Sequence, residues 1–217
     1  MMINKEIKIG KINTSKKELL DIGKAWLVIS LIFTVLHLGI NFFYVGSLSK
    51  IYSNYFIFYM ISSLFTVGIG FLFHEMAHKF MAQHYGCAAE FRADTMMLLF
   101  ALVMALLFGF TFIAPGAVMI AGMITRKENG IISLVGPLTN YCLGIIFLIL
   151  RIIFPYEILE VGFFVNFMLG LFNMIPFFMF DGKKIWDWNI AIWFVMVAAG
   201  IGFLFFLLPI LASFNIL

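Results

Sequence analysis

The chain alternates between long uncharged apolar runs and short polar segments. Six runs hold about 20 residues or more: Ala25–Val45, Ile51–Phe73, Thr95–Thr125, Asn129–Leu150, Val161–Phe180 and Trp188–Leu217. A helix of about 20 residues crosses the hydrocarbon core of a bilayer, so at least five of these runs predict single transmembrane helices. We expect the polar segment 1–24 to lie outside the membrane and residues 25–217 to form one membrane-embedded domain.

The run Thr95–Thr125 is too long for one simple span and too short for two. Ala114-Pro115-Gly116 should break a helix there, and the short segment Ala117–Ile120 is a candidate strand. Either Met96–Ile113 crosses the membrane, or the run enters and leaves on the same side. With a cytoplasmic N-terminus, a run that does not cross places 12 of the 14 Lys and Arg residues inside, whereas a crossing leaves 9 inside. The positive-inside rule therefore favours five full spans and a re-entrant hairpin.

The composition agrees with a membrane protein. Hydrophobic residues make up 64% of the 217 residues and charged residues 12%, and the mean hydropathy is +1.08. Soluble domains carry about 25% charged residues, and a soluble globule of this size could not bury so much apolar surface. A soluble enzyme, a disordered chain and a nucleic-acid-binding module are excluded on this basis. We expect an all-α multi-pass protein of the cell membrane, with five to six transmembrane helices and a re-entrant or short β segment. Six lysines in segment 1–24 indicate that the N-terminus is cytoplasmic.

Ionisable residues follow directly after the second apolar run, in His74-Glu75-Met76-Ala77-His78. Ionisable side chains in a membrane helix are costly and mark functional sites. Residues four apart on a helix share one face, so both imidazoles can bind the same metal ion. Glu75, one residue on, suits a general base. The pattern His-Glu-x-x-His is the signature of zinc proteases.

A tetrahedral zinc site needs a third protein ligand. His84 is rotated away from His78 on an unbroken helix, and His37 lies in the middle of the first run, so neither is favoured. Asp181 ends the run Val161–Phe180, after Pro176 and before Gly182, a residue that permits a tight turn. In the five-span topology Asp181 lies on the same side of the membrane as the histidines, whereas in the six-span topology it lies on the opposite side.

Three motifs in this order resemble the site-2 protease family of intramembrane zinc metalloproteases. They are His74-Glu75-x-x-His78 with Ala82 and Gly86, Gly136-Pro137-Leu138-Thr139-Asn140, and Asn173-x-x-Pro176-x-x-x-x-Asp181-Gly182. The resemblance covers about residues 56–184. It implies one Zn²⁺ ion held by His74, His78 and Asp181, with Glu75 as the base, in a core made by the second, third and fourth full spans. It also implies that Asn140 and Asn173 bind the substrate or its oxyanion.

The expected activity is hydrolysis of a peptide bond within or near the transmembrane helix of a membrane-protein substrate. An unwound substrate could pair with the edge of a strand at Ala117–Ile120. The alternative is a membrane transporter or channel-like protein with a non-catalytic metal site, which would tolerate Glu75→Gln. A di-iron membrane oxygenase is disfavoured, because it would need more histidines than the four in this chain. The partners expected are a transmembrane protein substrate and the lipid bilayer, with no nucleic acid.

Overall fold

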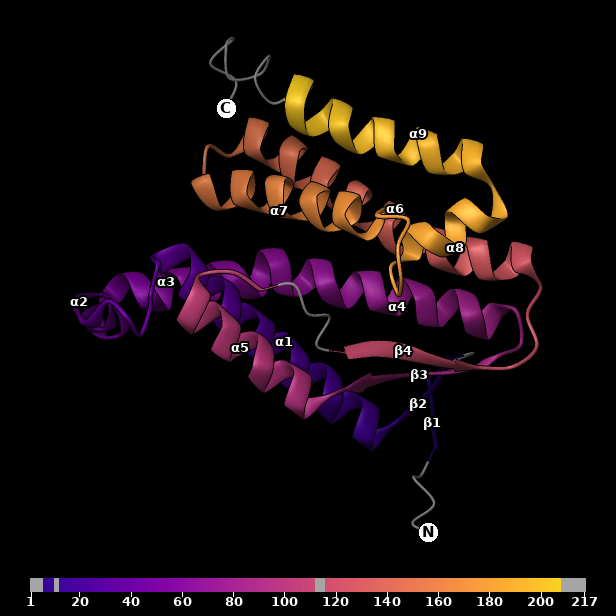
Figure 1. Cartoon of the computed structure of the whole chain (residues 1–217), viewed down its shortest axis with the longest axis horizontal. Helices are drawn as coiled ribbons and strands as arrows, with labels where there is room; N and C mark the ends of the chain where they lie inside the picture. The colour runs from indigo at the N-terminus through magenta and orange to yellow at the C-terminus, as the bar shows by residue number, and fades with distance from the viewer. Residues whose placement is uncertain (1–5, 10–11, 112–115, 208–217) are drawn as a thin grey trace. The chain divides into compact units, whose positions relative to one another are not determined.

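The computed structural model describes residues 6–9, 12–111 and 116–207. Contacts between Cα atoms divide the chain into two compact units. The first unit comprises Met1–Leu72 and Glu90–Met119, and the second comprises Phe73–Ala89 and Ile120–Leu217. Figure 1 labels the helices and strands along the chain.

The first unit is built on an N-terminal hairpin and the helices that follow it. Strands β1 and β2 pair antiparallel, with Glu6 opposite Ser15. The elements along the first part of the chain are β1 (Glu6–Ile9), β2 (Ile12–Ser15), α1 (Lys16–Leu38), α2 (Val45–Leu48), the 3₁₀ turn Ser49–Tyr52, α3 (Asn54–Ser63), the π turn Leu64–Gly68 and α4 (Ile69–His84). Helix α4 belongs to the second unit from Phe73 on. Strands β3 (Ala88–Ala93) and β4 (Gly116–Ala121) pair with each other, and α5 (Thr95–Phe108) lies between them in the chain.

Helices α3 and α4 are joined through the π turn into one continuous helix, Asn54–His84. The indole Nε1 of Trp26 on α1 donates to the carbonyl of Leu64, where the π turn begins, over 3.0 Å. A Cβ on Gly68 would lie 2.6 Å from the same indole ring, so only glycine allows α1 to approach this closely. A π turn leaves backbone groups without their usual helical partner, and the Trp26 side chain supplies one.

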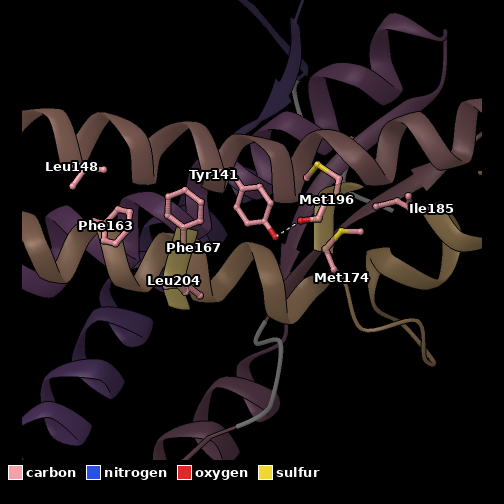
Figure 2. Close-up of a cluster of buried hydrophobic side chains, with 8 residues drawn as sticks. All are labelled: Tyr141, Leu148, Phe163, Phe167, Met174, Ile185, Met196 and Leu204. Carbon is pink, nitrogen blue, oxygen red and sulfur yellow. Dashed lines mark hydrogen bonds between the residues drawn. The ribbon is translucent and has the colours of Figure 1, made fainter. Parts of the chain in front are cut away.

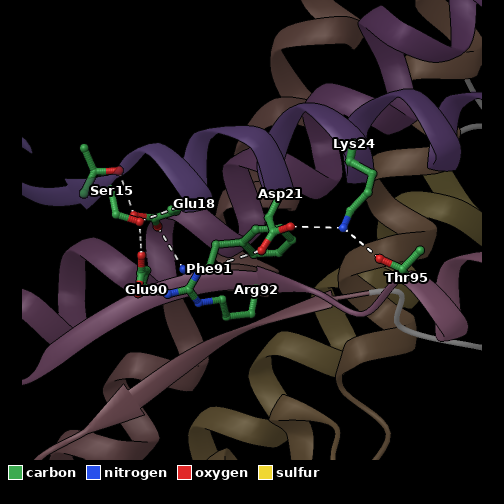
Figure 3. A network of polar contacts seen from close by, with 9 residues as sticks. Ser15, Glu18, Asp21, Lys24, Glu90, Phe91, Arg92 and Thr95 are labelled. Atoms are coloured by element: carbon green, nitrogen blue, oxygen red, sulfur yellow. Dashed lines mark hydrogen bonds and ion pairs between the residues drawn. The ribbon is translucent and has the colours of Figure 1, made fainter. Parts of the chain in front are cut away.

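A polar network in the first unit joins the start of α1 to β3 and α5 (Figure 3). Ser15 caps α1 by accepting from the backbone N–H of Glu18, and its hydroxyl donates to Glu90. The fully buried carboxylate of Glu18 accepts from the N–H of Phe91 over 2.8 Å and from the Thr14 hydroxyl over 2.7 Å. One turn on, Lys24 pairs with Asp21 and donates to Thr95, while Arg92 pairs with Glu90. These contacts give every carboxylate in the network a donor, as buried charges require.

The second unit is a bundle of helices. After the remainder of α4, its elements are α6 (Arg126–Ile153), α7 (Glu157–Asn173), α8 (Asp181–Trp188), α9 (Ile190–Ile201) and the π turn Gly202–Leu207. Helix α6 begins with a capping box formed by Thr125 and Glu128, and Pro137 lies within it. The short connection between α6 and α7 makes these two helices neighbours, and they pack along each other (Figure 1).

The core of the second unit is an aromatic cluster between α6, α7 and α9 (Figure 2). The ring of Phe167 stacks on Tyr141 with centroids 5.1 Å apart and on Phe203 with centroids 4.7 Å apart. A Cβ on Gly144 would lie 2.4 Å from the Phe167 ring, so this glycine makes room for the ring against α6. The Tyr141 hydroxyl donates to the backbone carbonyl of Met196 over 3.2 Å, which satisfies the buried polar group.

The prediction of a mainly helical chain is confirmed, and the structure is consistent with a helical membrane protein. In the described part of the chain, three helices are long and apolar enough to cross a membrane: Lys16–Leu38, Asn54–His84 and Arg126–Ile153. Many large apolar side chains on these helices are exposed, including Phe58, Phe65 and Ile149. Exposed apolar surface of this extent is typical of contact with lipid or another protein.

Element boundaries differ from those of the apolar runs. Helix α1 starts at Lys16, so the end of the polar segment 1–24 is helical. Within Thr95–Thr125, α5 ends at Phe108 and is capped by Gly109, whose φ is 72°. The expected break at Ala114-Pro115 lies outside the described residues, as does Ile113, but the expected strand is present as β4. At 14 residues, α5 is about 21 Å long. That is shorter than the hydrocarbon core of about 30 Å.

Candidate metal centre

The two histidines of the His-Glu-x-x-His motif meet on one face of α4. His74 and His78 are 5% and 8% exposed. Their Nε2 atoms lie 3.0 Å apart, and the two rings meet edge to face with centroids 4.6 Å apart. The helix produces this pairing by itself, because residues four apart follow each other on the same face.

Asp181, the first residue of α8, completes the group. Its Oδ2 lies 3.2 Å from Nε2 of His74 and 2.9 Å from Nε2 of His78. The ligand atoms of these three residues all lie within 4.8 Å of one another, and theirs is the group that can hold a metal ion among the described residues. Ligand atoms of a tetrahedral zinc site with bonds of about 2.0–2.1 Å are about 3.3 Å apart. The observed separations are close to that value, so the three residues fit a zinc ion.

A close backbone approach brings Asp181 to the histidines. A Cβ on Gly182 would lie 2.2 Å from the carbonyl oxygen of Met174 at the end of α7, so only glycine fits here. Gly182 was expected to permit a tight turn, but it lies in the first turn of α8 and its φ is not positive. The residue with a positive φ in this loop is Phe178, at 50°. The helix before the loop ends at Asn173, three residues ahead of Pro176, because proline disfavours helical conformation in the residue before it.

Hydrogen bonds from α6 fix the orientation of both imidazole rings. Nδ1 of His78 lies 2.6 Å from the backbone carbonyl of Ile132, and Nδ1 of His74 lies 2.6 Å from Oδ1 of Asn140. A carbonyl oxygen only accepts, so both Nδ1 atoms carry a proton and donate. Each Nε2 is then the atom directed at Asp181 and is available as a metal ligand. This is the usual arrangement of metal-bound histidines, whose second nitrogen donates to a protein oxygen.

Gly136 makes room for the rings against α6. A Cβ at this position would lie 2.4 Å from Cε1 and Nε2 of His78 and 2.8 Å from Cε1 of His74. Pro137 follows and, having no N–H, removes one helical hydrogen bond and loosens the turn around it. The helical donor that Pro137 lacks would have bonded the carbonyl of Ser133. The carbonyl of Ile132 accepts from the His78 ring beside its own helical partner, Gly136. The missing side chain of Gly136 therefore lets two side chains of α4 lie directly on the backbone of α6.

The charges at the site are balanced. Burial by itself raises the pKa of the Asp181 carboxyl, but the nearby His78 and His74 outweigh burial and hold that pKa below its ordinary range. Oδ1 of Asp181, the oxygen turned away from the histidines, pairs with the half-exposed Lys184 over 3.6 Å. An ionised carboxylate beside two ring nitrogens requires positive charge among the three atoms. Either protons on the imidazoles or a metal ion can supply that charge.

The other predicted site residues, Glu75, Asn140 and Asn173, belong to the same unit. Glu75 is 8% exposed, and its carboxylate interacts electrostatically with the His78 ring. Asn140 is fully buried with its oxygen on His74, so a contact with substrate stays a prediction for this residue. Asn173, at the end of α7, is part-buried, and its Nδ2 donates to the carbonyl of Leu169. Of the two histidines not favoured as ligands, His84 meets the Tyr85 ring edge to face, and His37 lies at a tilt against the Tyr59 ring in the first unit.

Two groups that orient the histidines were not predicted from the sequence. The carbonyl of Ile132 is a backbone group, so residue types carry no signal of its role. Asn166 is fully buried in the middle of α7 and hydrogen-bonds to Asn140. The sequence could have predicted a buried hydrogen bond for Asn166, because an amide within the apolar run Val161–Phe180 needs a partner inside the protein.

Comparison with known proteins gives two relatives, both from Methanocaldococcus jannaschii. A protein named putative zinc metalloprotease MJ0611 is 39% identical over 200 residues, which cover 89% of this chain and 96% of that protein. A protein named zinc metalloprotease MJ0392 is 27% identical over 122 residues, which cover 54% of this chain and 31% of that protein. No protein-family model matches the chain, and no solved structure gives a significant match. Because the first match extends over nearly the whole of both proteins, the chain belongs to the same family, the zinc metalloproteases.

Proposed function

We propose that this protein is an intramembrane zinc metalloprotease of the site-2 protease type. It hydrolyses a peptide bond within or near the transmembrane helix of membrane-protein substrates, as in regulated intramembrane proteolysis. The observation that carries the proposal is the convergence of His74, His78 and Asp181, with ligand atoms 2.9–3.2 Å apart, at the end of a long apolar helix. These three residues hold one Zn²⁺ ion.

The chemistry follows from the groups around the ion. When bound, zinc polarises the scissile carbonyl and lowers the pKa of water at the site. Glu75, next to His74 in the chain, is the general base that takes the proton from the attacking water. The same carboxyl then gives the proton to the amide nitrogen that leaves. Asp181 takes part through its carboxylate as the third ligand, with Oδ2 beside both Nε2 atoms, and not as an acid or base.

Asn173 is the better placed of the two amides for the substrate. Its Nδ2 uses one N–H for the carbonyl of Leu169, and the second N–H can donate to a substrate carbonyl. Asn140, by contrast, is fully buried and engaged with His74. A contact from Asn173 would help to hold the oxyanion that develops during hydrolysis.

The membrane arrangement proposed is five full spans and a re-entrant segment formed by α5 and β4. The short length of α5, 14 residues, favours re-entry over a crossing. Irregular backbone at membrane depth must be covered by protein or water, so this segment has to pack on the helices. The protein is then a multi-pass protein of the cell membrane, embedded in lipid, with its lysine-rich N-terminus in the cytoplasm.

The test is cleavage of a reporter transmembrane helix by the purified full-length protein in detergent, with metal analysis of the same sample. The reporter carries Gly and Pro in its span, because a helix must unwind before its carbonyls can be attacked. We expect about one zinc per chain and cleavage that Glu75→Gln abolishes while zinc remains bound. Zinc that stays bound together with a function that Glu75→Gln leaves intact would favour the transporter alternative. A wild-type protein that holds no metal would refute the proposal.

A further inference from the structure

Two buried amides on neighbouring helices lead from the backbone of α7 to the metal centre. Asn140 on α6 and Asn166 on α7 are both fully buried. Nδ2 of Asn140 donates to Oδ1 of Asn166 over 3.2 Å, and Nδ2 of Asn166 donates to the carbonyl of Gly162 over 2.9 Å. A buried amide without partners costs about 1–3 kcal/mol, so a chain of donors and acceptors is the favourable arrangement here.

The direction of this chain is fixed at its far end. The backbone carbonyl of Gly162 can only accept, so the NH₂ group of Asn166 must face it. The oxygen of Asn166 then faces Asn140, which must turn its own NH₂ group toward that oxygen. This leaves Oδ1 of Asn140 facing Nδ1 of His74, at 2.6 Å. Each step has one donor and one acceptor, so no amide can reverse without losing a hydrogen bond.

The direction of the chain determines which nitrogen of His74 carries the proton. With the Asn140 oxygen in front of it, Nδ1 must donate, and Nε2 keeps its lone pair for the metal. If the Asn140 amide were reversed, its NH₂ group would face Nδ1, and the proton of a neutral ring would move to Nε2. A protonated Nε2 cannot bind a metal ion. His78 does not depend on such a chain, because its Nδ1 donates directly to the backbone carbonyl of Ile132.

We propose that Asn166 is a positioning residue that, through Asn140, holds His74 in the tautomer that binds the metal. This rests on the proposed zinc site, and it assigns Asn140 to the histidine instead of the substrate. Loss of a hydrogen-bonding partner of a metal ligand commonly weakens metal affinity about 10- to 100-fold. We expect the same range for Asn166, because without it the Asn140 amide can reverse and His74 loses its acceptor.

The experiment compares zinc affinity among variants of the full-length protein in detergent, by competition with a chelator of known affinity. Asn166→Leu keeps the approximate size but removes both hydrogen bonds, and we expect zinc to bind about 10- to 100-fold more weakly. Asn166→Asp keeps the shape, and burial favours its uncharged acid, which donates to Gly162 and accepts from Asn140. We expect this variant to bind zinc within a few-fold of the wild type. The absorption spectrum of the Co²⁺-loaded protein should change in Asn166→Leu and not in Asn166→Asp.

Tyr141→Phe is the matched control. It removes a different buried hydrogen bond from α6, the one to Met196, without touching the site. Its zinc affinity should equal that of the wild type even if its unfolding temperature falls. Equal zinc affinity and an unchanged Co²⁺ spectrum in Asn166→Leu would overturn the positioning role, and so would equal weakening in Asn166→Asp and Asn166→Leu. A wild-type protein that binds no zinc would instead refute the proposed metal centre, so the two failures are distinct.

Discussion

Replacing Gly136 with alanine tests how the metal centre depends on close packing between α4 and α6. The added Cβ would lie 2.4 Å from Nε2 of His78 and 2.8 Å from Cε1 of His74. Carbon contacts are favourable at about 3.5–4.0 Å, so the His78 ring or the helix must move by about 1 Å. Metal–ligand distances vary by only about 0.2 Å in functional sites. We therefore expect Gly136→Ala to weaken zinc binding at least about 100-fold.

The same substitution should stabilise α6 as a helix, so weaker zinc binding could not be explained by a weaker helix. Alanine favours a helix by about 1 kcal/mol over glycine, so α6 itself should not be weakened. The assay is chelator competition for zinc, combined with thermal unfolding of the metal-free protein in detergent. Gly23→Ala is one control, because a Cβ on Gly23 in α1 meets nothing within 4 Å. Gly144→Ala is the other control, because its Cβ would clash with the Phe167 ring in the core. We expect this variant to unfold at a lower temperature with its histidine rings in place. Wild-type zinc affinity in Gly136→Ala would refute this account of the site.

Three further predictions concern the charged groups at the site. Glu75→Gln should lower the rate of peptide cleavage at least about 100-fold while zinc content stays at the wild-type level, because the base is lost and the ligands remain; metal analysis and the reporter assay check both. Asp181→Ala should lose zinc on dialysis under conditions in which the wild type retains it, and the wild type stripped by a chelator should regain activity when zinc is added back. Lys184→Ala should change zinc affinity less than about tenfold, because exposed ion pairs are weak and the Lys184 side chain is 42% exposed. A larger loss of affinity in the same chelator competition would show that Lys184 holds Asp181 in place.

Periodicity within one element predicted the histidine pair correctly. His74 and His78 are four residues apart in a helix, and that spacing alone brings their rings to a centroid distance of 4.6 Å. The prediction of a membrane protein followed from composition, because apolar residues at 64% cannot all be buried in a chain of this length. The first conclusion depends on the spacing of two residues and the second on composition, and both can be read from the sequence without a structure.

Helix ends were predicted less well, for a physical reason. The run Val161–Phe180 looks like one helix, but α7 ends at Asn173 and an apolar loop follows. The loop residues Phe177, Phe178 and Met179 are exposed, and their hydropathy is like that of residues in the apolar helices. If this loop lies at membrane depth, as the proposed arrangement has it, its apolar residues are expected, and hydropathy cannot separate such a loop from a helix.

The sequence by itself predicted a helical membrane protein, placed two histidines on one helical face and made Asp181 the candidate for the third ligand. Only the tertiary structure decided which atoms meet. It brings Asp181 to the histidines through the close approach at Gly182, turns Asn140 toward His74 and recruits Asn166 and the carbonyl of Ile132. Apart from the approach of Gly182 to Met174, these contacts join residues 26 to 107 positions apart, and the direction of a hydrogen bond depends on partners that no local pattern specifies.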